Sequence, residues 1–397
     1  MRSPLPWMLK AIIFFLPVIA LAADGLQRQE LFTSGQGGYA QYRIPGIVVT
    51  GKGTVLAYAE ARKSLRGDWG TIDIVLRRSA DRGATWSPFQ VIAHVDGPKV
   101  KNPVAVAQNL ATNDEVTYNN PVAIADRRTS AVHFLFCLEY MRAFYMRSDD
   151  DGLTFSKPVE ITSAFDAFRP GYPWKVLATG PGHGIQLRNG RLLVAIWLST
   201  GTGGHAHRPS VTSTIYSDDA GKTWHPGEIA VPDTPEFVFP NETTAAQLSN
   251  GSVLLNVRTE SKSHRRAIVT SPDGATHWST PRFDQRLVEP ICFGTILSLG
   301  GKRLVFANPD NLEKQGAAVE PGKNRDRKNL TVQYSPNDGA SWTAKRVIEP
   351  NWSGYSDLAQ GRDKMIHLFY ESGVANAPTF QTASLQLTSF SISWLTR

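Results

Sequence analysis

One eight-residue pattern, Ser-x-Asp-x-Gly-x-Thr-Trp, recurs along the chain. It occurs as 79–86 (SADRGATW), 148–155 (SDDDGLTF) and 217–224 (SDDAGKTW), and in weaker form as 335–342 (SPNDGASW). A fifth stretch, 271–278 (SPDGATHW), keeps the composition but changes the spacing. The starts at 79, 148, 217, 271 and 335 are separated by 69, 69, 54 and 64 residues. Repetition at such a period indicates an array of similar structural units.

Each copy is expected to form a tight turn between two strands. An Asp side chain bonds to nearby backbone N–H groups, and Gly adopts a positive φ without a Cβ clash. The aromatic residue that ends each copy can pack the turn against the strands. The residues before the copies, for example 72–76 and 211–216, are alternating or apolar and rich in strand-forming types. The pattern therefore predicts a scaffold role for these aspartates, with no part in chemistry.

The rest of the sequence predicts an all-β protein. Short β-rich runs, separated by Gly, Pro, Asn and Asp, fill the chain from residue 26 onward, with little helical periodicity. About 375 residues divided by a repeat near 62 gives about six units. We expect a six-bladed β-propeller of four-stranded antiparallel blades, because a β-sandwich would not carry one turn motif at this period. No polar linker divides the chain, so residues 23–397 are expected to form one domain.

The N-terminus has the features of an export signal. Arg2 and Lys10 precede the apolar run 11–21, which ends in small residues. This run is short for a membrane span, so residues 1–22 are expected to be a signal peptide rather than an uncleaved anchor. The protein would then be periplasmic or secreted, with no membrane span in the mature chain. Removal of the two basic residues lowers the formal charge from +7 to about +5.

The sequence lacks the motifs that are typical of several function classes. The two cysteines, Cys137 and Cys292, cannot form a disulfide framework, and the sequence leaves open whether they pair. The nine histidines are scattered, with no metal-ligand spacing. There is no phosphate-binding Gly loop, no Gly-x-Ser-x-Gly elbow and no basic stripe. We therefore expect no metal, no cofactor and no nucleic-acid partner.

A further set of motifs resembles a known family. Arg43-Ile44-Pro45 is followed by Glu60-Ala61-Arg62 and then by Asp68. Together with the repeated Asp-boxes, also called BNR repeats, these motifs resemble the bacterial-type exo-α-sialidases, or neuraminidases. The resemblance covers essentially the whole mature chain. It implies a glycoside hydrolase that removes terminal α-linked sialic acids from glycoproteins, glycolipids and oligosaccharides.

The resemblance implies three arginines that bind the substrate carboxylate. Arg43 comes from Arg-Ile-Pro, Arg258 follows an Asn-Gly turn and a strand, and Arg327 lies in an Arg-x-x-Leu context, with Arg325 as the nearby alternative. Guanidinium suits this task because it keeps its charge and presents paired donors to a carboxylate. Three such cations repel each other, and the family steadies the first with a late glutamate, which corresponds to Glu371 in Phe-Tyr-Glu.

The nucleophile implied by the resemblance is a tyrosine. A carboxylate nucleophile would be repelled by the substrate's own carboxylate, and sialidases with a Tyr nucleophile are a known exception among glycosidases. The family context matches residues 354–358 (GYSDL), which assigns the role to Tyr355. Glu242, located 16 residues before Arg258, would be its base, because a phenol with a pKa of about 10 needs a partner to react near neutrality.

Asp68 is the expected general acid and base. It lies on the loop 67–70 (GDWG), where a carboxyl group could protonate the leaving oxygen and later deprotonate water. Asp73 is the alternative, although it starts a strand. Trp69 would either raise the pKa of Asp68 by desolvation or stack on the aglycone. Arg62 is expected to line the pocket near the 4-position of the sugar, in a direct or a supporting role.

Other functions share parts of this pattern. A non-catalytic glycan-binding propeller would keep the Asp-boxes but would have no need for the arginines, the tyrosine, the acid and the base together. A trans-sialidase, an enzyme that forms an anhydro product and an enzyme that prefers a deaminated sialic acid share the same core set. The sequence also leaves open the linkage preference and the oligomeric state.

Overall fold

The computed structural model describes residues 20–21, 26–314 and 323–397. Over these residues the chain is all-β, as predicted, with three short helices: α1 (Pro103–Ala107), α2 (Ser163–Asp166) and α3 (Ile392–Thr396). The predicted signal peptide lies outside the described residues except for β1 (Ala20–Leu21), which pairs with β2 (Gln27–Thr33). Within the described part of the chain, no helix has the length and apolar character needed to cross a membrane.

Four sheets are each built from strands that follow one another closely in the chain. The first holds β3 (Gln41–Val49), β4 (Val55–Arg62), β5 (Ile72–Ser79) and β6 (Gln90–Val91). The second holds β7 (Tyr118–Ala125), β8 (Val132–Leu138), β9 (Arg142–Ser148) and β10 (Val159–Glu160), with β12 (Gly182–His183) added parallel to β7. The third holds β11 (Val176–Thr179), β14 (Leu192–Ser199), β15 (Ser210–Ser217) and β16 (His225–Pro226), with β13 (Ile185–Gln186) beside β14. The fourth holds β17 (Thr243–Gln247), β18 (Val253–Val257), β19 (Arg265–Ser271) and β20 (Arg282–Val288).

A fifth, larger sheet contains two groups of strands joined by one long strand. It holds β21 (Thr295–Ser298), β22 (Leu304–Pro309), β23 (Lys328–Ser335), β24 (Ala344–Gln360), β25 (Ile366–Gly373) and β26 (Thr382–Phe390), followed by β2 and β1. Up to Trp352, β24 pairs with β23, and from Ser353 onward it pairs with β25. β24 thus belongs to two four-stranded groups, β21–β24 and β24–β25–β26–β2. In the second group a strand from the N-terminal region completes strands from the C-terminal region.

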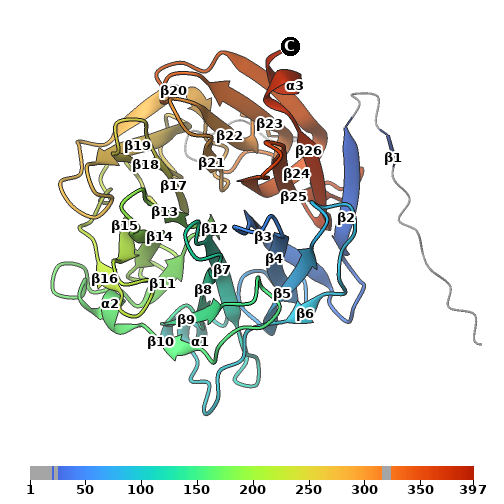
Figure 1. Ribbon diagram of the computed structural model, residues 1–397. Helices are drawn as coiled ribbons and strands as arrows, with labels where there is room; N and C mark the ends of the chain where they lie inside the picture. Colours follow the sequence, from blue (N-terminus) through green and yellow to red (C-terminus); the bar gives the residue numbers. More distant parts are fainter. Residues whose placement is uncertain (1–19, 22–25, 315–322) are drawn as a thin grey trace, which may run out of the picture.

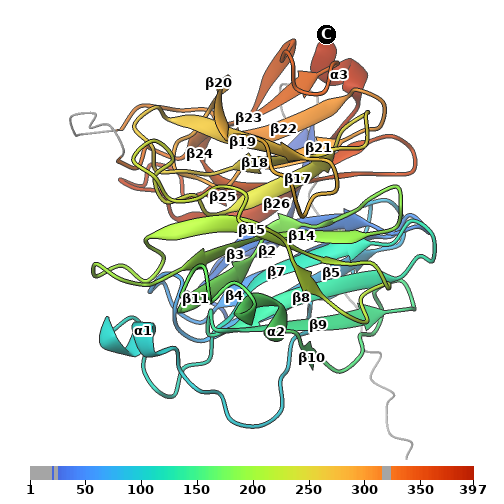
Figure 2. The same ribbon diagram turned by 90° about the vertical axis from the view of Figure 1, so that its left-hand side faces the viewer.

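The sheets lie around a common centre. Figure 1 shows β3, β7, β12, β13 and β17 close to this centre, and the later strands of each group farther out. Figure 2 shows the groups from the side, with β17 above β14 and β15, and β7 and β8 below these. Buried apolar side chains fill the space between neighbouring sheets; Val122 and Leu135, for example, belong to one cluster with Leu177 and Leu192 of the next sheet. Residues at the inner strand ends are therefore brought together from distant parts of the sequence.

The repeated Asp-boxes form the turns that were predicted for them. They follow β5, β9, β15, β19 and β23, and each joins the third strand of a group to the fourth. In the first copy, Asp81 accepts the backbone N–H of Thr85 at 2.9 Å and its hydroxyl at 2.6 Å, while Gly83 adopts a φ of 91°. Asp150 and Asp219 make the same two contacts. These aspartates fasten turns, which confirms the scaffold role.

The two cysteines are unpaired in the structure. Cys137 lies in β8 and Cys292 lies just before β21, and both are buried. Burial raises the pKa of each thiol to about 12, so both behave as small apolar side chains.

Candidate active site

The expected site residues lie in or next to four different strands. Arg43 is near the start of β3, Glu242 directly precedes β17, and Arg258 directly follows β18. Tyr355 lies in the part of β24 that pairs with β25. Each comes from a different segment, and their side chains meet because the inner strands approach the common centre.

Tyr355 and Glu242 form a close pair. The phenolic oxygen of Tyr355 lies 2.6 Å and 2.7 Å from the two carboxylate oxygens of Glu242. Arg258 donates from the same Nη1 to the Tyr355 oxygen, at 2.8 Å, and to Glu242. A phenol that touches both a carboxylate and a guanidinium can lose its proton to the first while the second stabilises the phenolate.

The environment keeps the Tyr355 hydroxyl protonated in the free protein. Burial raises the pKa of Tyr355 well above its ordinary value, and the charge of Glu242 raises it further. The charges of Arg258 and Arg327 lower it but do not outweigh these effects. The resting group is therefore a neutral phenol, with its base already in place.

Glu371 connects Arg43 to the backbone around Tyr355. Arg43 Nε donates to Glu371 Oε1 at 2.6 Å, which is the pair that the sequence suggested. The same carboxylate accepts the backbone N–H of Ile44 at 3.1 Å and that of Tyr355 at 2.9 Å. Glu371 is fully buried, so its charge both offsets Arg43 and fixes two chain segments relative to each other.

Gly354 makes room for this carboxylate. A Cβ added at Gly354 would overlap Glu371 Oε2 and would also press on the ring of Phe380. The glycine is required by this close approach, since its φ lies outside the left-handed region.

Arg327, and not Arg325, lies against the tyrosine. The Arg327 guanidinium carbon is 5.2 Å from the centre of the Tyr355 ring, and that of Arg43 is 5.5 Å from it. Arg327 Nη2 donates to the Ile291 carbonyl at 3.0 Å, while Arg325 Nη1 donates to the carbonyl of Lys323. Arg43, Arg258 and Arg327 thus all contact Tyr355, as an anion-binding group requires.

Arg62 and Asp68 form an adjoining ion pair. Arg62 Nη1 lies 3.0 Å from Asp68 Oδ1, and Arg62 Nη2 lies 2.6 Å from Glu60 Oε2. The Asp68 side chain is 45% exposed, whereas that of Arg62 is 1% exposed. The buried guanidinium therefore positions an accessible carboxyl group, and its contacts with Glu60 and Asp68 favour the supporting role that the sequence left open. The alternative acid, Asp73, instead accepts the hydroxyl of Tyr39 at 2.7 Å.

The pKa of Asp68 is lowered in the structure. Burial by itself would raise it, but the charges of Arg62, His207 and Arg43 together hold it below its ordinary range. Desolvation thus acts in the direction suggested for Trp69, but the three positive charges outweigh it and the net pKa of Asp68 is lowered. Trp69 is 5% exposed and packs on Tyr140, with ring centres 4.6 Å apart, so it is a wall of the site rather than an open stacking surface.

Some residues of the site were missed in the sequence. Glu60 could have been found, because residues two apart on a strand share a face and the Glu-Ala-Arg motif places Glu60 beside Arg62. Phe293 and Cys292 pack under Tyr355 in a small buried cluster with Ile44. Their neighbourhood leaves no motif in the sequence, because it depends on how distant strands meet.

Among the described residues, no group of three or more His, Cys, Asp and Glu side chains is placed to hold a metal ion. The side chains described above give the site several chemical groups. It combines an oxygen nucleophile with a base, a separate carboxyl group, and three guanidiniums that can hold an anion.

Comparisons with known proteins agree with this set of groups. A family model described as a BNR repeat-like domain matches residues 70–368. A sialidase of Micromonospora viridifaciens is 26% identical over 92% of this chain and 54% of its own length. A sialidase of Bacteroides fragilis is also 26% identical, over 89% of this chain and 64% of its own length. The chain thus spans less than two thirds of these two relatives.

Solved structures give the same grouping at the level of the fold. The microbial sialidase Hz136 superposes with a TM-score of 0.71, at 22% identity, over 93% of this chain and 69% of the other. A leech intramolecular trans-sialidase superposes with a TM-score of 0.69, at 18% identity, over 93% and 70%. At these identities the likeness concerns the fold alone. The family match covers most of the chain, and we conclude that the chain belongs to the BNR repeat-like family, within which its relatives are sialidases.

Proposed function

We propose that this protein is an exo-α-sialidase that hydrolyses terminal α-linked sialic acids with retention of configuration. The observation that carries the proposal is the contact of Tyr355 with both Glu242 and Arg258, beneath the guanidiniums of Arg43 and Arg327. The sialidase relatives support the same substrate class. We also propose that the fold is a six-bladed β-propeller; the division of β24 between two four-stranded groups supports this count, because each group then forms one blade.

Binding depends on the three arginines. A sialic acid bears its carboxylate on the carbon that is attacked, so the site must hold an anion throughout the reaction. Arg43, Arg258 and Arg327 supply paired donors for it, and Arg43 is kept in place by Glu371. The bound carboxylate also reduces the effect of Arg43 on Asp68, which raises the pKa of Asp68 toward the range where it can act as an acid.

In the first step the Tyr355 oxygen attacks the anomeric carbon. The phenolic proton passes to Glu242 as the new bond between oxygen and carbon forms. The bond to the leaving oxygen breaks, and Asp68 supplies a proton to that oxygen. The product of this step is an aryl glycoside between Tyr355 and the sugar, which keeps its carboxylate, and the aglycone is released as an alcohol.

The second step reverses the roles of these groups. Water approaches from the side that the aglycone has left, and Asp68 accepts a proton from it. The new carbon–oxygen bond forms as the bond to Tyr355 breaks, and Glu242 returns the proton to the phenolic oxygen. Two displacements at one carbon give net retention.

Incubation with a sialoglycoprotein tests the proposal. Release of free sialic acid is expected, with the α-anomer formed first in an NMR time course. Binding without release would favour a non-catalytic glycan-binding propeller, and a first-formed β-anomer would contradict retention.

Product analysis separates the related enzyme classes. Transfer of the sugar to added lactose would indicate a trans-sialidase, and release of an anhydro sugar would indicate an intramolecular reaction like that named for the leech protein. Faster turnover of a deaminated sialoside than of an N-acylated one would indicate the variant specificity. A panel of α2,3-, α2,6- and α2,8-linked substrates would define the linkage preference.

Export is part of the proposal. The basic and apolar pattern of residues 1–22 supports cleavage after this segment. N-terminal sequencing of the protein recovered from the periplasm or the medium tests this, and an intact Met1 in the exported protein would contradict it.

A further inference from the structure

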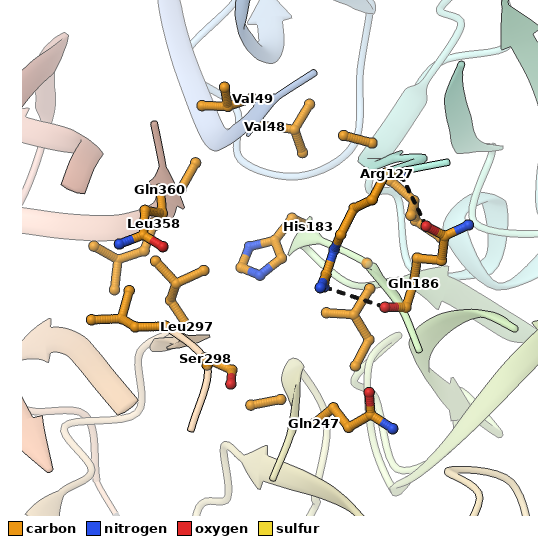
Figure 3. A pocket seen from close by; sticks show the side chains of 18 of the residues that line it. Val48, Val49, Arg127, His183, Gln186, Gln247, Leu297, Ser298, Leu358 and Gln360 are labelled. Carbon is orange, nitrogen blue, oxygen red and sulfur yellow. Dashed lines mark hydrogen bonds between the residues drawn. The ribbon is translucent and has the colours of Figure 1, made fainter. Parts of the chain in front are cut away.

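A cavity lies at the ends of the inner strands that are opposite to the candidate active site. It has a volume of about 400 Å³ and is lined by the last residues of β3, β7, β13, β17, β21 and β24 (Figure 3). The inner strands that carry the candidate active site run toward it: β3 leads from Arg43 to Val49, and β24 leads from Tyr355 to Gln360. Six residues of strand correspond to about 20 Å, so this cavity is separate from the site around Tyr355.

The lining of this cavity is cationic. Arg127, Arg188 and Arg362 each stand two residues after the end of an inner strand, β7, β13 and β24 respectively. Lys364 is also part of the lining, and no Asp or Glu is among the lining residues. Three chain segments thus place an arginine at the same register position around one opening.

The arginines retain donors for a ligand. Arg127 Nη2 donates to the Gln186 carbonyl at 3.3 Å, as Figure 3 shows, and Arg362 Nη1 donates to the Gly51 carbonyl at 2.9 Å. Arg188 donates from both terminal nitrogens to backbone carbonyls. A guanidinium has five N–H donors, so most of them are left over in each case. Within the described ranges, none of the three guanidiniums is paired with a carboxylate.

The positive charges of Arg127 and Arg188 repel each other. Partial desolvation lowers the pKa of Arg127, and the charge of Arg188 lowers it further. Water screens part of this repulsion, because both side chains are exposed. A bound oxyanion would remove this repulsion and would also use the spare N–H donors.

His183 provides a donor at the inner wall of the cavity. Figure 3 shows its ring between Val48, Leu297 and Arg127. Its Nδ1 lies 2.7 Å from Asp357 Oδ1. Burial lowers the pKa of His183, but the charge of Asp357 and its hydrogen bond outweigh burial and raise it.

The Asp357 carboxylate also accepts hydrogen bonds from two other residues. Its Oδ2 accepts the backbone N–H of Ile47, and its Oδ1 also accepts the hydroxyl of Thr295. The carboxylate therefore holds His183 in position from below and does not itself face a ligand as an unpaired anion.

Polar side chains suited to a small hydrophilic ligand complete the lining. Gln186 and Gln247 each use the side-chain oxygen to accept the backbone N–H of Arg127 and Arg188, respectively. Ser298 and Gln360 line the same space (Figure 3). Fixed amides beside cationic donors are the usual means of orienting a polar ligand.

We infer that this cavity is a second binding site, which takes a small molecule bearing a carboxylate or phosphate group. The oxyanion lies between Arg127 and Arg188 and within reach of His183, and Arg362 and Lys364 supply further positive charge at the opening. The site is independent of the sialidase proposal, because it shares no side chain with the groups around Tyr355.

Calorimetric titration of the full chain with inorganic phosphate, and in a second arm with citrate, tests the inference. The double variant Arg127→Gln/Arg188→Gln should bind the preferred probe at least about tenfold more weakly, because charge-assisted hydrogen bonds are lost. Lys222→Gln/Arg282→Gln removes two exposed charges elsewhere and should bind like the wild type. Arg327→Gln, which alters the candidate active site, should also leave this binding unchanged. Preference for phosphate or for citrate identifies which oxyanion the site takes.

The inference is overturned if the wild type binds neither probe, if the double variant binds both as the wild type does, or if Arg327→Gln alone abolishes binding. Arg127 and Arg188 also tie neighbouring segments together, so the double variant is checked by its melting temperature. If the double variant does not fold, Arg362→Gln/Lys364→Gln is used instead. The Lys364 side chain makes no hydrogen bond or ion pair among the described residues, and Arg362 donates to the Gly51 carbonyl. Unchanged affinity in that folded variant would equally overturn the inference.

Discussion

The phenolic oxygen of Tyr355 lies 2.6 and 2.7 Å from the two carboxylate oxygens of Glu242. The two residues are 113 positions apart in the chain: Tyr355 lies in β24, and Glu242 directly precedes β17. Either carboxylate oxygen can receive the proton, so small rotations of Glu242 do not break the path. Arg258 donates to both groups and would stabilise a negative charge on the phenolic oxygen.

Replacement of Tyr355 by Phe should abolish turnover while the fold is kept. The change removes only the oxygen, and the ring still packs 5.6 Å from that of Phe293. Loss of a nucleophile that works together with its base is expected to lower kcat by about 10³-fold or more. The measurement is kcat on an aryl α-sialoside, with circular dichroism as the test of folding.

Tyr145→Phe is the matched control. Tyr145 is also buried, and its hydroxyl bonds to His133 Nδ1 at 2.8 Å, far from the candidate site. This variant should keep wild-type kcat. Full activity in Tyr355→Phe would remove Tyr355 from the role of nucleophile.

Gly354→Ala should reduce activity by displacing Glu371. The added Cβ would overlap Glu371 Oε2, so the carboxylate must move away from Arg43 and from the backbone N–H of Tyr355. Overpacking of this kind costs about 1–3 kcal/mol in the free energy of unfolding. Urea denaturation and kcat/KM should both show the loss.

The control for this prediction is Gly171→Ala. No atom lies closer than 4.0 Å to a Cβ at Gly171, and its φ is not in the left-handed region, so stability and activity should change little. Equal effects of the two substitutions would show that the contact with Glu371 is not the cause of the loss in stability and activity.

Arg327→Lys should weaken substrate binding more than it slows the chemical step. The only hydrogen bond found for the Arg327 side chain among the described residues is to the Ile291 carbonyl, so its other donors are free for a substrate carboxylate. Lysine keeps the charge but loses the paired geometry, and KM is expected to rise by about 10-fold or more with a smaller change in kcat. A fall in kcat at constant KM would assign Arg327 to the chemical step instead.

The parts of the fold that could be predicted depend on local chemistry. The Asp-box turn depends on one aspartate and one glycine within a few residues. The roles of Asp81 and Gly83 in the turn could therefore be predicted from the sequence. The continuity of β24 could not be predicted. Nothing in the sequence at Trp352 or Ser353 marks where pairing passes from β23 to β25, because that choice is made by strands far away in the chain.

The candidate site could likewise be predicted only in part from the sequence. Arg43 and Glu371 could be paired from their motifs, but the low pKa of Asp68 required the position of Arg62 in three dimensions. The cationic cavity was missed because Arg127 resembles an ordinary surface arginine. Arg127 stands two residues after the end of an inner strand, as other arginines of the cavity do. This common position can be recognised only when the strand ends are known.

The stability of the protein should fall as the pH is lowered from about 6.5 toward 4, partly through His133. Burial, aided by the charge of Arg147, lowers the pKa of this histidine to about 4, although Asp126 acts in the opposite sense. The unfolded chain therefore binds a proton in this window that the folded chain does not. Stability is fully present above the unfolded pKa and decreases below it, by roughly 3 kcal/mol in total for this fully buried group.

Urea denaturation at several pH values between 4.5 and 7.5 measures this effect. His133→Gln should flatten the dependence of the unfolding free energy on pH. His94→Gln, at an exposed position, should leave the slope unchanged. The same slope in His133→Gln and the wild type would mean that other groups account for the acid sensitivity.

Asp68→Asn should slow the enzyme in a way that depends on the leaving group. Asparagine can still accept the hydrogen bond from Arg62, but it cannot carry the proton. Loss of general acid catalysis is expected to lower kcat/KM by about 10²–10⁴-fold on a sialyl-lactose, whose alcohol needs protonation. A nitrophenyl sialoside should lose far less, because its leaving group departs without a proton.

The same variant tests the second role of Asp68. With the activated substrate, the first step stays fast while water is no longer deprotonated, so a burst of nitrophenol should precede a slow steady state. Added azide, which needs no base, should restore the steady-state rate. Asp73→Asn provides the comparison, since Asp73 accepts the Tyr39 hydroxyl and should show neither the burst nor the change in leaving-group dependence. Equal losses on both substrates, with no burst, would reduce Asp68 to a binding residue, because an acid catalyst must discriminate between leaving groups of different basicity.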